Sequence, residues 1–132
     1  MKVRPYLVYV AGPYRAATVD GIRENIEAAR RVARRLWQAG YPTICPHMNT
    51  AFMDGAAPDE VWLQGGLVIL ERCDAIVLTP GWARSRGAVE EREYALARGL
   101  VVLEWDWKQE SDCLCDLYEA LRAREGDGGL AR

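Results

Sequence analysis

The sequence lacks long apolar runs and an excess of charge of either sign. Its 17 basic and 19 acidic residues give a net charge of −2, which favours neither a nucleic-acid polymer nor an anionic membrane as a partner. The apolar runs are far shorter than the roughly 18 residues of a membrane-spanning helix, and no charged-then-apolar leader opens the chain. We therefore expect a cytoplasmic protein that binds neither a membrane nor DNA or RNA.

Metal-binding and cofactor-binding motifs are missing as well. The four cysteines are scattered apart from one C-x-C pair, and no second cluster accompanies the single histidine, His47, so we expect no metal. No G-x-G-x-x-G follows the first predicted strand, and no G-x-x-x-x-G-K-[ST] occurs, which argues against a dinucleotide oxidoreductase and a GTPase. We expect the protein to use no cofactor.

The patterns that are present indicate alternating strands and helices. At 132 residues the chain suits one domain with a single core, and we assign residues 1–132 to it. Short β-branched or aromatic runs predict strands at 5–11, 43–45, 74–78 and 100–104, and helical periodicity predicts helices near 21–39, 59–73, 87–99 and 111–124. We expect Asp20 to cap the first helix and residues 49–58 to form a loop. The predicted fold class is α/β: one doubly wound, flavodoxin- or Rossmann-like parallel sheet of four to five strands, with helices on both faces.

Two unusual loops follow strands of this predicted sheet, at the carboxyl edge where doubly wound folds bind ligands. The segment GPYR, residues 12–15, follows the first strand, and PGWARSRGAVEE, residues 80–91, follows the third. Ser85 and Gly87 begin the next helix, where free N–H groups and the helix dipole favour a phosphate or carboxylate. Ordinary helix caps use the same residue types, so both explanations stay open at this point.

Three glutamates follow in the same predicted helix, and their positions separate them. Acidic side chains in a first turn favour the helix dipole, which by itself explains their presence. At 100° per residue, however, Glu91 lies on a small-residue edge that can approach the sheet, whereas Glu90 and Glu93 point more toward solvent. A carboxylate beside an anion site, partly dried by aromatic neighbours, can act as a nucleophile or general base. Glu91 is therefore the catalytic candidate.

Together these segments resemble a known family. The set comprises YVAGPY at 9–14, NI at 25–26, PH at 46–47, CD at 73–74, PGW at 80–82 and S-x-G-A-x-x-E-x-x-x-A at 85–95. It is similar to the nucleoside 2-deoxyribosyltransferase-like superfamily, including short bacterial and phage members of the DUF4406 type and the 2′-deoxynucleoside 5′-phosphate N-hydrolases. The resemblance spans roughly residues 6–104, and the spaced Ser, Gly, Glu and Ala set is its specific part.

The resemblance implies cleavage of an N-glycosidic bond, or deoxyribosyl transfer, on a nucleoside or its 5′-monophosphate. Glu91 would attack the anomeric carbon, and Tyr9 would hold the glutamate. The residues expected to bind substrate are Gly12, Tyr14, Arg15, His47, Asn49, Trp82, Ser85 and Gly87. Two of them keep a structural alternative, because a lone histidine at a strand end is often a structural hydrogen-bonding group and a tryptophan often simply packs. The resemblance also implies a homodimer.

One position departs from the family pattern. Relatives usually carry an aspartate eight residues before the position of Asp74, and this chain has Gly66 there. Asp54 or Asp59 are possible substitutes, although a turn residue and a helix-start residue explain them equally well. Two other functions therefore stay open: a catalytically silent nucleotide-binding or sensing module, and a ribonucleotide phosphoribohydrolase resembling the cytokinin-activating enzymes.

Overall fold

Four parallel strands form the centre of the structure, a computed structural model that describes residues 2–126. They are β1 (Val8–Ala11), β2 (Thr43–Ile44), β3 (Ala75–Leu78) and β4 (Val101–Glu104), and their order in the sheet is β2-β1-β3-β4. Each lies within a strand predicted from the sequence, although β1 begins three residues later than expected. The parallel α/β fold is as predicted, and in the described residues the sheet has the lower of the two predicted strand numbers.

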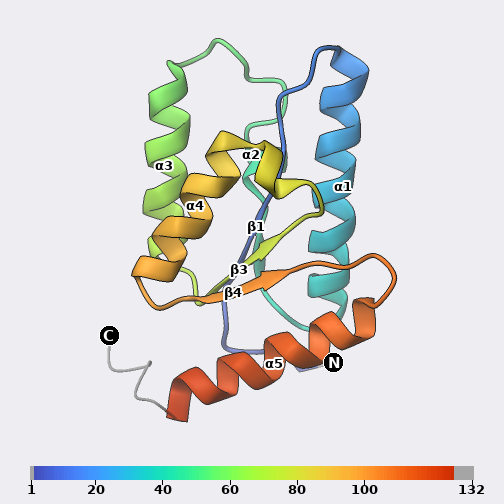
Figure 1. Cartoon of the computed structure of the whole chain (residues 1–132), viewed down its shortest axis with the longest axis vertical. Coiled ribbons are helices and arrows are strands. Elements are labelled where there is room, and N and C mark those ends of the chain that lie inside the picture. Colours follow the sequence, from blue (N-terminus) through green and yellow to red (C-terminus); the bar gives the residue numbers. More distant parts are fainter. Residues whose placement is uncertain (1, 127–132) are drawn as a thin grey trace.

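Helices connect the strands, and two of them depart from the sequence prediction (Figure 1). The α-helices are α1 (Val19–Gln38), α2 (Pro46–Asn49), α3 (Asp59–Glu71), α4 (Arg86–Ala97) and α5 (Glu110–Gly126), and a short 3₁₀-helix η1 covers Trp82–Arg84. Thr18, not Asp20, caps α1, because its Oγ1 accepts the Gly21 N–H at 3.0 Å. Helix α2 was not predicted; Pro46 stands in its first turn, where proline is well tolerated. Helix α3 runs unbroken through Gly65 and Gly66.

Side chains of the strands alternate between two buried layers. Residues such as Val8 and Val77 pack with α1 and α5, whereas Tyr9 and Ile76 pack with α3 and α4. In β1 and β3 every residue is buried, because helices cover the sheet on both faces. This explains why both strands read as continuous apolar runs in the sequence.

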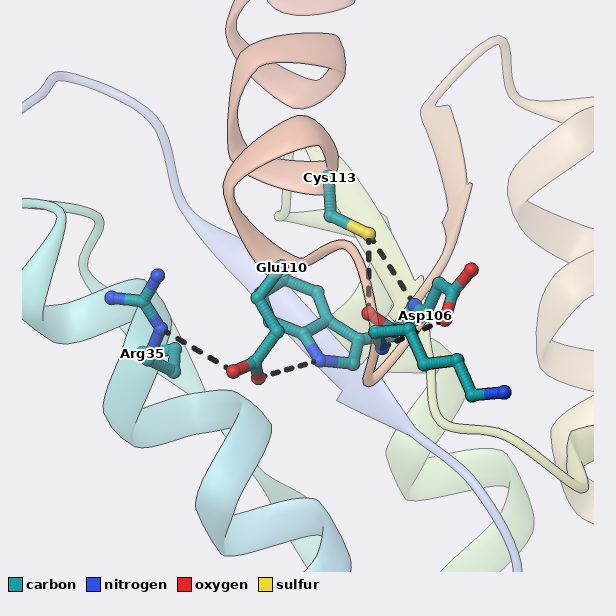
Figure 2. Close-up of polar contacts among 6 residues, drawn as sticks. Arg35, Asp106, Glu110 and Cys113 are labelled. Atoms are coloured by element: carbon teal, nitrogen blue, oxygen red, sulfur yellow. Dashed lines mark hydrogen bonds and ion pairs between the residues drawn. The ribbon is translucent and has the colours of Figure 1, made fainter.

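The start of α5 is tied to α1 through the segment that follows β4. In Figure 2, Arg35 of α1 faces Glu110, with 3.9 Å between Arg35 Nε and Glu110 Oε1. The Trp105 indole N–H donates to the other oxygen of Glu110 at 3.1 Å, and Cys113 Sγ accepts the Asp106 N–H at 3.3 Å. These contacts involve none of the residues singled out from the sequence as site candidates, and they hold the start of α5 against α1 and the end of β4.

The strand order defines where a ligand site is expected. The chain leaves β1 to form β2 on one side of it and returns to form β3 on the other, so the order reverses between β1 and β3. The loop after β3 is joined to β1 by the Thr79 N–H, which donates to the Ala11 carbonyl at 2.8 Å. In the described part of the chain, no helix has the combination of length and apolar character needed to cross a membrane.

Candidate active site

A cavity of about 1190 Å³ opens at the carboxyl edge of β1. Its walls come from the GPYR loop, α2, the segment before α3, α3 itself and the first turns of α4. Of the residues predicted from the sequence, those that line it are Tyr9, Gly12, Tyr14, Arg15, His47, Asn49, Ser85, Gly87 and Glu91. The two loops singled out from the sequence therefore do contribute to one cavity.

Tyr9 and Glu91 form a hydrogen-bonded pair in the wall of this cavity. The Tyr9 hydroxyl donates to Glu91 Oε2, and the tyrosine is 1% exposed. Burial raises the pKa of Glu91 to about 7, although the hydrogen bond from Tyr9 acts in the opposite direction. Burial and the nearby carboxylate also raise the pKa of Tyr9, so the proton stays on the hydroxyl. In residues 2–126 no hydrogen-bond donor meets Glu91 Oε1, which leaves one carboxylate oxygen for chemistry.

Side chains of the GPYR loop contact the segment that precedes α3. The Tyr14 hydroxyl donates to Asp54 Oδ1 at 2.9 Å and accepts the Phe52 N–H at 3.1 Å. Arg15 forms an exposed ion pair with Asp59. Tyr14 and Arg15 thus connect the end of β1 with the segment before α3, and both aspartates proposed as substitutes for the missing family aspartate already have partners.

His47 contacts the same loop through a hydrogen bond and a ring contact. It is buried, and its Nε2–H donates to the Pro13 carbonyl at 2.8 Å, while its ring meets the edge of Tyr14 at a centroid distance of 5.4 Å. Burial lowers the pKa of His47, which keeps the imidazole neutral near pH 7. The structural hydrogen bond that the sequence left open is therefore present, on a side chain that also lines the cavity.

The start of α4 carries positive charge that sequence analysis missed. Ser85 caps the helix, since its Oγ accepts the Ala88 N–H at 3.2 Å, and Arg84 and Arg86 line the cavity beside it. Arg86 pairs with Glu90 at 3.0 Å, whereas Arg84 lies against Gly81 and has no carboxylate partner within residues 2–126. The signal was the basic pair that flanks Ser85 in the sequence ARSRG. Together with the helix N-terminus, these groups favour an anion.

The Ser85 cap makes a stability prediction. Ser85→Ala removes the acceptor for the Ala88 N–H, and losing such a cap costs about 1 kcal/mol of unfolding free energy. Urea denaturation followed by circular dichroism measures this, with Ser85→Thr as the control because it keeps a capping hydroxyl. An unchanged denaturation midpoint in Ser85→Ala would show that the cap contributes nothing.

Trp82 is not among the residues that line the cavity, so the structure does not bring it together with the other residues predicted to bind substrate. Its indole N–H donates to Glu104 Oε1 at 3.0 Å, and the Arg92 guanidinium lies 5.0 Å from the centroid of its ring. These contacts fit the alternative explanation for Trp82, in which the tryptophan packs beside the sheet. The tryptophan that does line the cavity is Trp62, on α3, which sequence analysis did not select.

Comparisons with known proteins bear on the fold and the family. The sequence matches no curated protein. Among solved structures, it is similar to the 2-desoxiribosyltransferase from Leishmania mexicana, with 22% sequence identity and a TM-score of 0.54. The match covers 76% of this chain and 64% of that protein's chain, so the similarity establishes a shared fold over part of the larger protein.

The family comparison is more extensive. Residues 6–104 match the model of the domain of unknown function DUF7768. The narrower assignment to the DUF4406 type stays a prediction. Because the match spans most of the chain, the protein belongs to the DUF7768 family.

Proposed function

We propose that this protein cleaves the N-glycosidic bond of a nucleoside or nucleoside 5′-monophosphate, or transfers its deoxyribosyl group, with Glu91 as the nucleophile. The observation that carries the proposal is the hydrogen bond between the buried Tyr9 and the half-buried Glu91, which line a cavity beside the positively charged start of α4. The solved relative is named as a 2-desoxiribosyltransferase, which is the same class of chemistry.

The reaction follows from the position of the carboxylate. Oε1 of Glu91 attacks the anomeric carbon while the glycosidic C–N bond breaks, and the electron pair of that bond leaves with the base, which takes up a proton from solvent. The sugar is then held as an ester of Glu91. Water attacks the same carbon, the C–O bond to Glu91 breaks, and a proton of the water passes to solvent as the sugar leaves. In a transfer, a nitrogen of a second base attacks instead and gives up its proton. The Tyr9 hydroxyl at Oε2 stabilises the carboxylate each time it is regenerated.

The cavity offers different partners to the two ends of a nucleotide. A 5′-phosphate would bind at Arg84, Ser85 and the Gly87 N–H, where positive charge and helix N-terminus coincide. The base would lie toward Trp62 and Asn49, which supply a ring for stacking and an amide for hydrogen bonding. Glu91, on α4, lines the same cavity. Arg15 would contribute to phosphate binding only after leaving Asp59.

A silent nucleotide-binding module is the second candidate, because Gly66 stands where the resemblance to the deoxyribosyltransferase-like superfamily leads us to expect an aspartate. A chromatographic assay for free base separates the two functions. We expect base release from at least one 5′-monophosphate in a panel of ribo- and deoxynucleotides, each compared with its unphosphorylated nucleoside. Binding by calorimetry without base release from any of them would favour the module, and release restricted to ribonucleotides would favour a phosphoribohydrolase.

We also propose that the protein acts in the cytoplasm as a homodimer. Exposed apolar side chains on α3 support the dimer, since Val61 is 55% and Val68 54% exposed. Size-exclusion chromatography with light scattering measures the oligomeric state, and a monomer at micromolar concentration would remove the dimer from the proposal.

A further inference from the structure

Helix α3 passes very close to the Tyr9–Glu91 pair at Gly66. A Cβ atom built at this buried glycine would lie 2.9 Å from the Tyr9 hydroxyl oxygen and 3.4 Å from Glu91 Oε2. The first distance is shorter than Cβ atoms in proteins show, and the second is at the close limit of ordinary van der Waals contact. Both atoms belong to the same hydrogen bond. A side chain at position 66 would therefore collide with that hydrogen bond.

The neighbouring glycine differs. A Cβ atom at Gly65 would meet nothing within 4 Å, although both glycines are in the interior of α3. An interior glycine destabilises a helix by about 1 kcal/mol relative to alanine, so each has the same local cost. Only Gly66 has a packing reason that requires the absence of a side chain. Gly65 therefore serves as a matched control for substitutions at Gly66.

We propose that Gly66 is a positioning residue for Glu91: the missing side chain lets the backbone of α3 close over the Tyr9–Glu91 hydrogen bond and shield it from water. The consequence for catalysis rests on the proposed function, whereas the packing relation does not.

A double-mutant cycle tests the packing relation. Gly66→Ala is made in the native protein and in the Tyr9→Phe variant, which lacks the oxygen that the new methyl group would meet. We expect Gly66→Ala to lower the urea midpoint in the native background and to leave it unchanged or raise it in the Tyr9→Phe background. Gly65→Ala should leave the midpoint unchanged or raise it in both, because alanine favours the helix. Equal losses from Gly66→Ala in both backgrounds, including failure to fold in both, would overturn the proposal.

Proton NMR supplies a readout that a general packing defect would not give. A tyrosine hydroxyl that is shielded from water and bound to a carboxylate gives a slowly exchanging downfield proton signal, assigned here by its loss in Tyr9→Phe. We expect the signal in the native protein and in Gly65→Ala, and its loss in Gly66→Ala while the amide signals of α1 and α5 stay in place. An unchanged hydroxyl signal in Gly66→Ala would contradict the positioning role.

These outcomes are separate from those of the proposed function. If the native protein releases no base from any nucleotide, the proposed reaction fails, but the cycle and the hydroxyl signal still report on Gly66. If base is released and the cycle shows no coupling between positions 9 and 66, the positioning role fails alone.

Discussion

Replacing Glu91 with glutamine should lower the rate of base release by about 1000-fold or more, the scale seen when a catalytic nucleophile is removed. Glutamine keeps the size of the side chain and still offers a carbonyl oxygen to the Tyr9 hydroxyl, so the cavity should stay intact. It cannot form the sugar ester, because the amide is a poor nucleophile. The loss should therefore fall on the chemical step and leave nucleotide binding within a few-fold of the native value.

The chain offers a matched control for this variant. Glu93 lies on the same helix, is exposed, and does not line the cavity, so Glu93→Gln removes one charge without touching the site. We expect it to release base at the native rate. Chromatography measures the rate, and calorimetry measures the affinity of both variants. Glu91→Gln working at more than a tenth of the native rate would contradict the nucleophile assignment.

The rate of base release should depend steeply on pH below neutrality. Burial raises the pKa of Glu91 to about 7, and only the ionised carboxylate can attack, so the rate should fall about tenfold for each pH unit below 7 and level off above it. The same shift acts oppositely on stability. Because the native state holds this proton more tightly than the unfolded state, the contribution of Glu91 to stability should decrease as the pH rises from about 4.5 to 7.

Initial rates between pH 5 and 9 test this dependence. A substrate phosphate titrates near pH 6, so the profile is also measured on the unphosphorylated nucleoside, which lacks that ionisation. A rate constant that stays level from pH 5 to 8 on both substrates would mean that Glu91 is not the titrating group that limits the reaction.

The sheet and its long helices could be predicted because their sequence patterns are local. Strands buried on both faces read as apolar runs, and α1 and α3 are long enough to display helical periodicity. Helix α2 escaped prediction because four residues, Pro46–Asn49, are too few to form a periodic pattern. The cap of α1 was misplaced because Thr18 and Asp20 are both suitable capping residues, and only the backbone geometry separates them.

The candidate site was predictable to the extent that fold topology places it. Helix phase singled out Glu91, and the family resemblance implied that Tyr9 holds it; the structure joins the two side chains by a hydrogen bond. Contacts between distant segments were not predictable. Arg15 pairs with Asp59, which is 44 residues away in the sequence, at the rim of the cavity. Trp82 donates a hydrogen bond to Glu104, which is 22 residues away, and does not line the cavity.

The packing around Gly66 was also not predictable from the sequence. The resemblance marked position 66 only as a departure from the expected pattern, whereas its proposed role depends on Tyr9 from β1 and Glu91 from α4 lying close to the backbone of α3 at one point.

The stereochemistry of the first-formed product tests the central claim most directly. If Glu91 forms a covalent ester, two successive displacements at the anomeric carbon return it to its starting configuration. With methanol present to capture the sugar, proton NMR of the fresh product should show a methyl glycoside with the same anomeric configuration as the substrate nucleotide. An inverted glycoside would mean that methanol attacks directly with Glu91 as a base, and it would contradict the nucleophilic mechanism proposed for this site.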